Sequence, residues 1–78
     1  MKTKLFKIGE VANYGKWRMT LKGENVILDG IDYITNETQE RAVFQVGDYF
    51  QIQMYLEKNM SYFYADKIVS LLKKWENA

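Results

Sequence analysis

Hydrophobic and polar residues alternate most clearly over residues 16–22. Trp17, Met19 and Leu21 fall on one side of an extended chain, and every position between them is polar or basic. A period of two is typical of a β-strand with one buried side. We therefore predict a strand whose apolar side faces a core, although the pattern alone leaves the reversed register open. The outward side then carries Lys16, Arg18, Thr20 and Lys22.

A second alternation spans residues 49–56 and follows the turn signal Gly47-Asp48. It predicts another strand, and three more are predicted over residues 3–13, 26–34 and 62–69. Residues 41–46 fit either a short helix or an irregular crossover. The chain end differs, because Ile68, Leu71, Leu72 and Trp75 share one helical stripe. We expect a short amphipathic helix over residues 69–77.

Composition adds constraints to this β-rich pattern. The chain has 78 residues, of which 47% are hydrophobic, so we expect a single domain with a packed core. It contains no Cys, His or Pro. Disulfides, thiolate metal sites and imidazole proton shuttles are therefore excluded. Aromatic residues make up 15% of the chain, more than so small a core is expected to hide, and some rings should reach the surface.

Charge is segregated along the chain despite a net charge of +1. The first 22 residues are basic, residues 23–48 are mostly acidic, and the remainder is mixed. A basic stripe on one face is the electrostatic mark of a polyanion-binding site. The alternative is that these charges only solvate the outer sides of strands.

The order of elements resembles the OB-fold, the oligonucleotide/oligosaccharide-binding barrel. The resemblance covers residues 4–72 and is carried by I-G-E-V at 8–11, W-R-M-T-L at 17–21, V-G-D-Y-F-Q-I at 46–52 and A-D-K-I at 65–68. It implies a mainly β fold, a small five-stranded Greek-key barrel over residues 3–69 with the short helix at its end. An SH3-like barrel is the open alternative.

The resemblance also implies where a ligand lies, across the outer face of the second and third strands and the adjoining loops. Basic side chains there contact phosphates and aromatic rings stack on bases. We predict a module for single-stranded nucleic acid, with DNA expected ahead of RNA. It would serve replication, recombination or repair, in a mobile element for example, beside a partner enzyme or as an oligomer. The candidate residues are Tyr14, Lys16, Arg18, Thr20, Lys22, Lys58, Tyr62 and Tyr64.

The alternative function is a protein-interaction module or inhibitor that docks on a larger protein through the barrel edge or the terminal helix. Its candidate residues are Leu71, Leu72 and Trp75. An enzyme is not expected, because Ser61 and Ser70 stand in no catalytic setting and the acidic residues match no metal loop. We expect no cofactor and no metal. With no signal peptide and no membrane segment predicted, a cytoplasmic location is the default.

Overall fold

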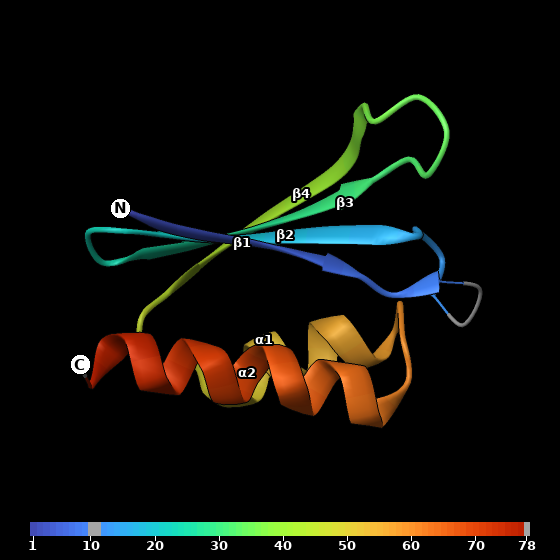
Figure 1. Ribbon diagram of the computed structural model, residues 1–78. Coiled ribbons are helices and arrows are strands. Elements are labelled where there is room, and N and C mark those ends of the chain that lie inside the picture. Colours follow the sequence, from blue (N-terminus) through green and yellow to red (C-terminus); the bar gives the residue numbers. More distant parts are fainter. Residues whose placement is uncertain (10–11, 78) are drawn as a thin grey trace.

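Four strands follow one another along the chain and pair in sequence order. The computed structural model describes residues 1–9 and 12–77, and Figure 1 shows its sheet above two helices. Every neighbouring pair is antiparallel, so the sheet is a meander with the order β1-β2-β3-β4. The strands are β1 (Lys2–Lys7), β2 (Lys16–Lys22), β3 (Asn25–Ile31) and β4 (Thr38–Gln45).

Both helices lie on the same face of the sheet and pack against each other (Figure 1). Helix α1 (Tyr49–Glu57) starts after Gly47, whose φ of 93° suits glycine, and the carbonyl of Asp48 accepts the N–H of Ile52 at 3.0 Å. Helix α2 (Tyr62–Glu76) is capped by Ser61, whose hydroxyl accepts the N–H of Tyr64 at 3.4 Å. The other face of the sheet stays open.

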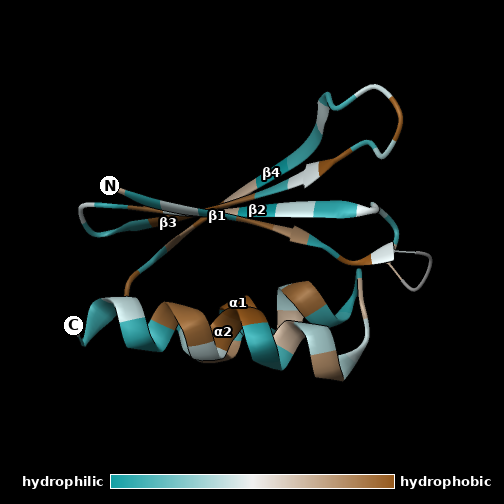
Figure 2. Ribbon diagram, viewed as in Figure 1, coloured by the Kyte–Doolittle hydropathy of each residue, from teal (hydrophilic) through white to brown (hydrophobic). Residues whose placement is uncertain are grey.

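One hydrophobic core fills the space between the sheet and the helices. Figure 2 shows hydrophobic stretches in both helices, which lie below the sheet. The stripe of α2 recurs at helical spacing, with Ala65, Ile68, Val69 and Leu72 buried. The sheet supplies Trp17 and Met19 from β2, both fully buried, which confirms the predicted register of that strand. The same alternation turns Arg18 away from the helices.

The mainly β character is confirmed, but the five-stranded barrel is wrong. Residues 49–56 and 62–69, predicted as the last two strands, belong to α1 and α2. In α1 the alternating apolar residues divide between two environments: Ile52 and Leu56, one helical turn apart, are buried, while Phe50 and Met54 are exposed. The terminal helix therefore begins at Tyr62 instead of near residue 69.

The segment left open between a helix and a crossover is the strand β4. Its inward side chains are Glu40, Ala42 and Phe44, and its outward ones include Val43. A charged residue facing in and an apolar one facing out hide the alternation from a sequence reading. The first strand is shorter than predicted and ends at Lys7. Glu10 and Val11, half of the motif quoted at 8–11, lie outside the described residues.

Candidate nucleic-acid interface

The open face of the sheet presents side chains in rows, because residues paired across strands share a face. The central row runs across all four strands through Leu5, Arg18, Asp29 and Arg41. The row beside it holds Lys7, Lys16, Ile31 and Thr38. On the other side lie Thr3, Thr20, Ile27 and Val43, and beyond them Lys22, Asn25 and Gln45.

An aspartate between two arginines forms the centre of this face. Asp29 Oδ2 accepts hydrogen bonds from Nε and Nη2 of Arg18, both at 3.2 Å, and its Oδ1 accepts from Nε of Arg41 at 2.6 Å. The Asp29 side chain is 2% exposed, against 37% for Arg18 and 58% for Arg41. The carboxylate is thus covered by two guanidinium groups that themselves reach solvent. Hydrogen bonding to Asp29 and its negative charge raise the pKa of Arg41 further.

This cluster keeps a net positive charge, because one carboxylate faces two guanidinium groups. Among the described residues Arg41 donates from Nε alone, which leaves Nη1 and Nη2 available. Asp29 is the single acidic residue among the strand residues of this face. The basic residues of the same face are Lys7, Lys16, Arg18, Lys22 and Arg41, and we call these five the basic face.

Four of the predicted site residues lie on this face: Lys16, Arg18, Thr20 and Lys22. Besides Arg18, which donates to Asp29, two of them are hydrogen-bonded to neighbours. Lys16 Nζ donates to Asn36 Oδ1 in the loop between β3 and β4, and Thr20 Oγ1 lies 3.4 Å from the Thr3 hydroxyl. The pattern of β2 alone was therefore enough to group four residues, whereas Lys7 and Arg41 come to the basic face only through strand pairing.

Tyr14 does not join them, because its ring turns to the helix side of the sheet. It meets the Trp17 ring edge-on with 5.6 Å between centroids, and its hydroxyl donates to Glu40 at 3.5 Å. A Cβ on Gly30 would lie 2.5 Å from Tyr14 Cδ2, so the ring occupies the place of a side chain on β3. Tyr14, predicted to bind nucleic acid, thus packs against the hydrophobic core.

Glu40 binds a second phenol on the same side. The hydroxyl of Tyr55 donates to Glu40 Oε2, and its ring packs edge-on against Trp17 with centroids 5.9 Å apart. Burial raises the pKa of Tyr55 well above its ordinary value, and the hydrogen bond to Glu40 and that group's charge add to the rise. This cluster braces the sheet against α1 and lies behind the basic face.

The remaining predicted residues, Lys58, Tyr62 and Tyr64, belong to the helix layer. Lys58 follows α1, and the Tyr62 and Tyr64 rings lie in the first turn of α2. Tyr62 is 68% exposed, whereas Tyr64 packs partly against the core. These three are therefore not brought together with the basic face.

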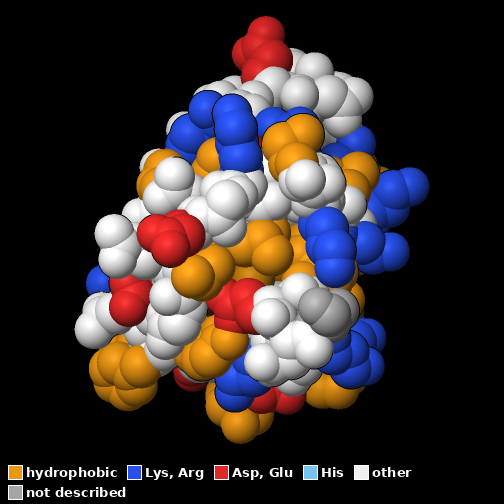
Figure 3. Space-filling model, turned by 90° about the vertical axis from the view of Figure 1, so that its left-hand side faces the viewer, with side chains coloured by type: hydrophobic (Ala, Val, Ile, Leu, Met, Phe, Trp, Pro, Cys, Tyr) orange, Lys and Arg blue, Asp and Glu red, His pale blue; other side chains and the backbone are white. Residues whose placement is uncertain are grey.

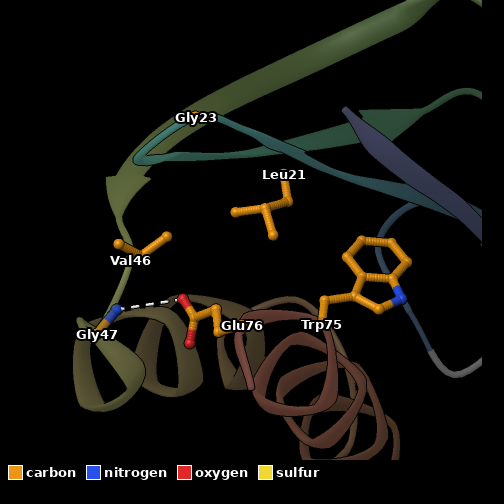
Figure 4. Close-up of a pocket in the computed structure, with 6 residues that line it drawn as sticks. All are labelled: Leu21, Gly23, Val46, Gly47, Trp75 and Glu76. Atoms are coloured by element: carbon orange, nitrogen blue, oxygen red, sulfur yellow. Dashed lines mark hydrogen bonds between the residues drawn. The ribbon is translucent and has the colours of Figure 1, made fainter. Parts of the chain in front are cut away.

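The docking residues of the alternative function are engaged in packing. Leu72 is fully buried, and Leu71 and Trp75 pack partly against the core. Trp75 also lines a hollow of about 430 Å³ between the strand ends and the end of α2, and in it the Gly47 N–H donates to Glu76 Oε1 at 3.3 Å (Figure 4). The other lining residues are Leu21, Gly23 and Val46.

The end view in Figure 3 places this hollow relative to the charges. Hydrophobic side chains reach the surface there, between the sheet above and the helices below. Lys and Arg side chains gather in the upper part of the view, where the sheet lies, and along its right edge. Because Leu21 points to the helix side, the hollow and the basic face lie on different sides of the sheet.

An aromatic residue that the sequence reading did not select is Tyr33. It lies in the loop between β3 and β4 and is 68% exposed. Lys16 Nζ is 5.9 Å from the centre of its ring. The signal in the sequence is a single tyrosine within a polar loop, and it gains meaning only when the hairpins bring the loop beside Lys16.

Comparison with known proteins gives no match: no protein family, no curated protein and no solved structure is significantly similar to this chain. Over residues 1–9 and 12–77, neither helix combines the length and apolar character needed to cross a membrane.

Proposed function

We propose that the protein binds single-stranded nucleic acid through the basic face of its sheet, with DNA expected ahead of RNA. The observation that carries the proposal is the cluster of Arg18 and Arg41 on Asp29. Two guanidinium groups are held in place by a carboxylate that neutralises only one of them. A guanidinium fork is suited to phosphate oxygens, so the unneutralised charge is directed at a polyanion.

The three lysines of the same face extend this positive surface along the sheet. Lys7 and Lys16 lie in the row next to the cluster, and Lys22 lies two rows beyond it on the other side. The helix layer carries as many acidic as basic residues: Asp48, Glu57, Asp66 and Glu76 against Lys58, Lys67, Lys73 and Lys74. A phosphate backbone is therefore attracted more strongly to the basic face, where five basic residues accompany one carboxylate.

Apolar side chains between the charges favour a single strand over a duplex. Leu5 and Val43 are 42% and 58% exposed on the open face, Leu5 opposite Arg18 and Val43 two residues from Arg41. They offer contacts to the faces of unpaired bases, which a duplex stacks inside. The packing of Leu72 and Trp75 also weighs against the alternative in which the helix end docks on a protein.

The proposal is of a small accessory factor in replication, recombination or repair that works in the cytoplasm. The sheet of a 78-residue protein covers only a short stretch of polynucleotide. We therefore expect modest affinity unless several copies or a larger enzyme bind together with it.

Fluorescence anisotropy with a labelled oligonucleotide of about 15 nucleotides tests the proposal. Binding should weaken between about 50 and about 200 mM salt, and the slope of log K against log salt should be about −0.7 for each phosphate neutralised. An unlabelled duplex should compete less well than the single strand. Absence of binding at about 50 mM salt, or binding insensitive to salt, would refute the proposal.

A pair of matched variants locates the surface. Lys7→Glu with Lys22→Glu changes the basic face without touching Asp29, and Lys67→Glu with Lys74→Glu makes the same change on exposed positions of α2. Each double variant lowers the net charge from +1 to −3, because two reversals remove four units. We expect at least about a tenfold loss of affinity in the first variant and a much smaller loss in the second. Equal losses would mean that net charge, and not the basic face, governs binding.

A further inference from the structure

Tyr33 lies in the loop between β3 and β4, and hydrogen bonds join the residues on either side of it. Asp32 Oδ1 accepts the N–H groups of Ile34 at 2.8 Å and Thr35 at 2.9 Å, and the Asp32 N–H donates to the Glu37 carbonyl at 2.9 Å. The hydrogen bonds from Thr35 and Ile34 lower the pKa of Asp32, so the carboxylate keeps its charge and its acceptor role to a lower pH than an ordinary aspartate does. The loop is thus closed by its own hydrogen bonds.

The ring itself rests on the first hairpin. A Cβ on Gly15 would lie 2.5 Å from Tyr33 Cδ2, so a glycine at this position lets the ring lie directly against the backbone. Lys16 Nζ lies 5.9 Å from the ring centre and also donates to Asn36 in the same loop. One side of the Tyr33 ring thus packs against Gly15, while 68% of the residue's surface is exposed and accessible to a ligand.

Its position relative to the basic face suggests a role. Lys16 is paired with Lys7 across β1 and β2, so the ring lies beside the row that holds two lysines. Single-strand binding surfaces combine basic groups that follow the phosphates with rings on which bases stack. The other rings of the sheet region are turned to the core side: Phe6, Tyr14, Trp17 and Phe44.

We propose that Tyr33 is the base-stacking platform of the basic face, and that one unpaired base lies on its ring while the adjoining phosphates contact Lys7 and Lys16. This inference rests on the proposed function and makes it more specific. The ligand class becomes a polynucleotide with at least one accessible base, as opposed to any polyanion. A tyrosine ring provides the flat apolar surface that a base requires and tolerates water at its hydroxyl.

The experiment compares two equally exposed tyrosines. Tyr33→Leu removes the proposed platform, and Tyr62→Leu removes a ring of the same 68% exposure from the helix layer. We expect Tyr33→Leu to weaken binding of the oligonucleotide about five- to 150-fold with an unchanged salt slope, Tyr33→Trp to preserve binding, and Tyr62→Leu to have little effect. Urea denaturation of each variant checks that the fold is retained.

An abasic oligonucleotide of the same length and charge provides a second measurement. The unmodified protein should bind it more weakly than the normal strand, whereas Tyr33→Leu should bind both alike. If Tyr33→Leu and Tyr62→Leu bind the normal strand equally well while salt-dependent binding persists, Tyr33 is not the platform and the proposed function stands. If the unmodified protein binds no oligonucleotide, the proposed function and this inference fail together.

Discussion

At the scale of the residue, the most unusual group is the carboxylate of Asp29. It is the one charged side chain among the buried residues that the structure describes, and it lies on the face that no helix covers. Two arginines shield it, one from each neighbouring strand. A buried carboxylate that loses its partners is costly, and two arginines brought close together without a carboxylate repel each other.

Asp29 should therefore stabilise the fold while restraining the two arginines that we propose bind phosphate. We expect Asp29→Ala to lower the free energy of unfolding by about 1–3 kcal/mol in urea denaturation, since it removes charge-assisted hydrogen bonds to both arginines. The affinity for an oligonucleotide should rise, because both guanidinium groups become free. Asp66→Ala, at an exposed position of α2, removes the same charge and should change stability by less than about 0.5 kcal/mol. A loss of affinity in Asp29→Ala would contradict the assignment of Arg18 and Arg41 to phosphate binding.

Tyr55 should make the free energy of unfolding depend on pH in the alkaline range. Burial and Glu40 raise the pKa of its hydroxyl, so the folded state favours the protonated form more than the unfolded state does. The stability that this provides is complete below the ordinary tyrosine pKa of 10.0 and is lost as the pH rises through the higher folded value. Urea denaturation at a series of pH values should therefore show a fall above about pH 10.

Two variants isolate this effect. Tyr55→Phe should flatten the alkaline fall and cost about 1 kcal/mol at neutral pH, because the hydrogen bond to Glu40 is lost. Tyr62→Phe removes a hydroxyl from an exposed ring and should keep the fall. An unchanged alkaline fall in Tyr55→Phe would show that another group causes it.

At the scale of the element, helix α2 shows how a local signal can decide a boundary. The aromatic run at 62–64 favours a strand, yet Ser61 caps the first turn and four buried residues recur at helical spacing behind it. The buried residues from Ala65 onward share one face of a helix. In an extended chain the same residues would point to both sides, and half of them would be left exposed. The cap and the stripe together outweigh the β propensity of three rings.

The cap can be tested against a serine in the same helix. Ser61→Ala should lower the free energy of unfolding by about 0.5–2 kcal/mol, because the Tyr64 N–H loses its acceptor. Ser70→Ala makes the same substitution at an exposed interior position, where alanine is the better helix former, and should be neutral or slightly stabilising. Thermal or urea denaturation of the two variants would measure the difference, and equal effects would contradict a capping role for Ser61.

The same scale explains why α1 was misread. Alternate apolar residues over 49–56 are compatible with a strand, and the two buried ones, Ile52 and Leu56, are also one helical turn apart. Nothing within this segment chooses between the two, since short apolar patterns fit both periods. Tertiary packing decides between them, because the apolar side of the four-stranded sheet has to be covered by a second layer. As a helix, α1 buries Ile52 and Leu56 against that side.

At the scale of the whole molecule, the two-layer arrangement creates the candidate site. Helices on one side of the sheet bury Trp17, Met19, Val26 and Leu28, and the opposite side is left to solvent with its charges. A closed barrel would have presented the outer residues of β2 on a convex wall. The open meander instead sets β4 beside β3, and so places Arg41 and Arg18 on either side of Asp29.

By itself, the sequence determined the strand β2 and grouped Lys16, Arg18, Thr20 and Lys22 on its polar side, and it predicted, with the reversed register still open, that the apolar side faces the core. A strict period of two places all the apolar side chains on one side of a strand and all the polar ones on the other. Tertiary structure alone decided the rest: that Tyr14 turns inward over Gly30, that Arg41 and Lys7 join the basic face, and that Tyr33 lies beside Lys16. These placements depend on which segments pair and which face the helices cover, and contacts between distant residues leave no local period in the chain.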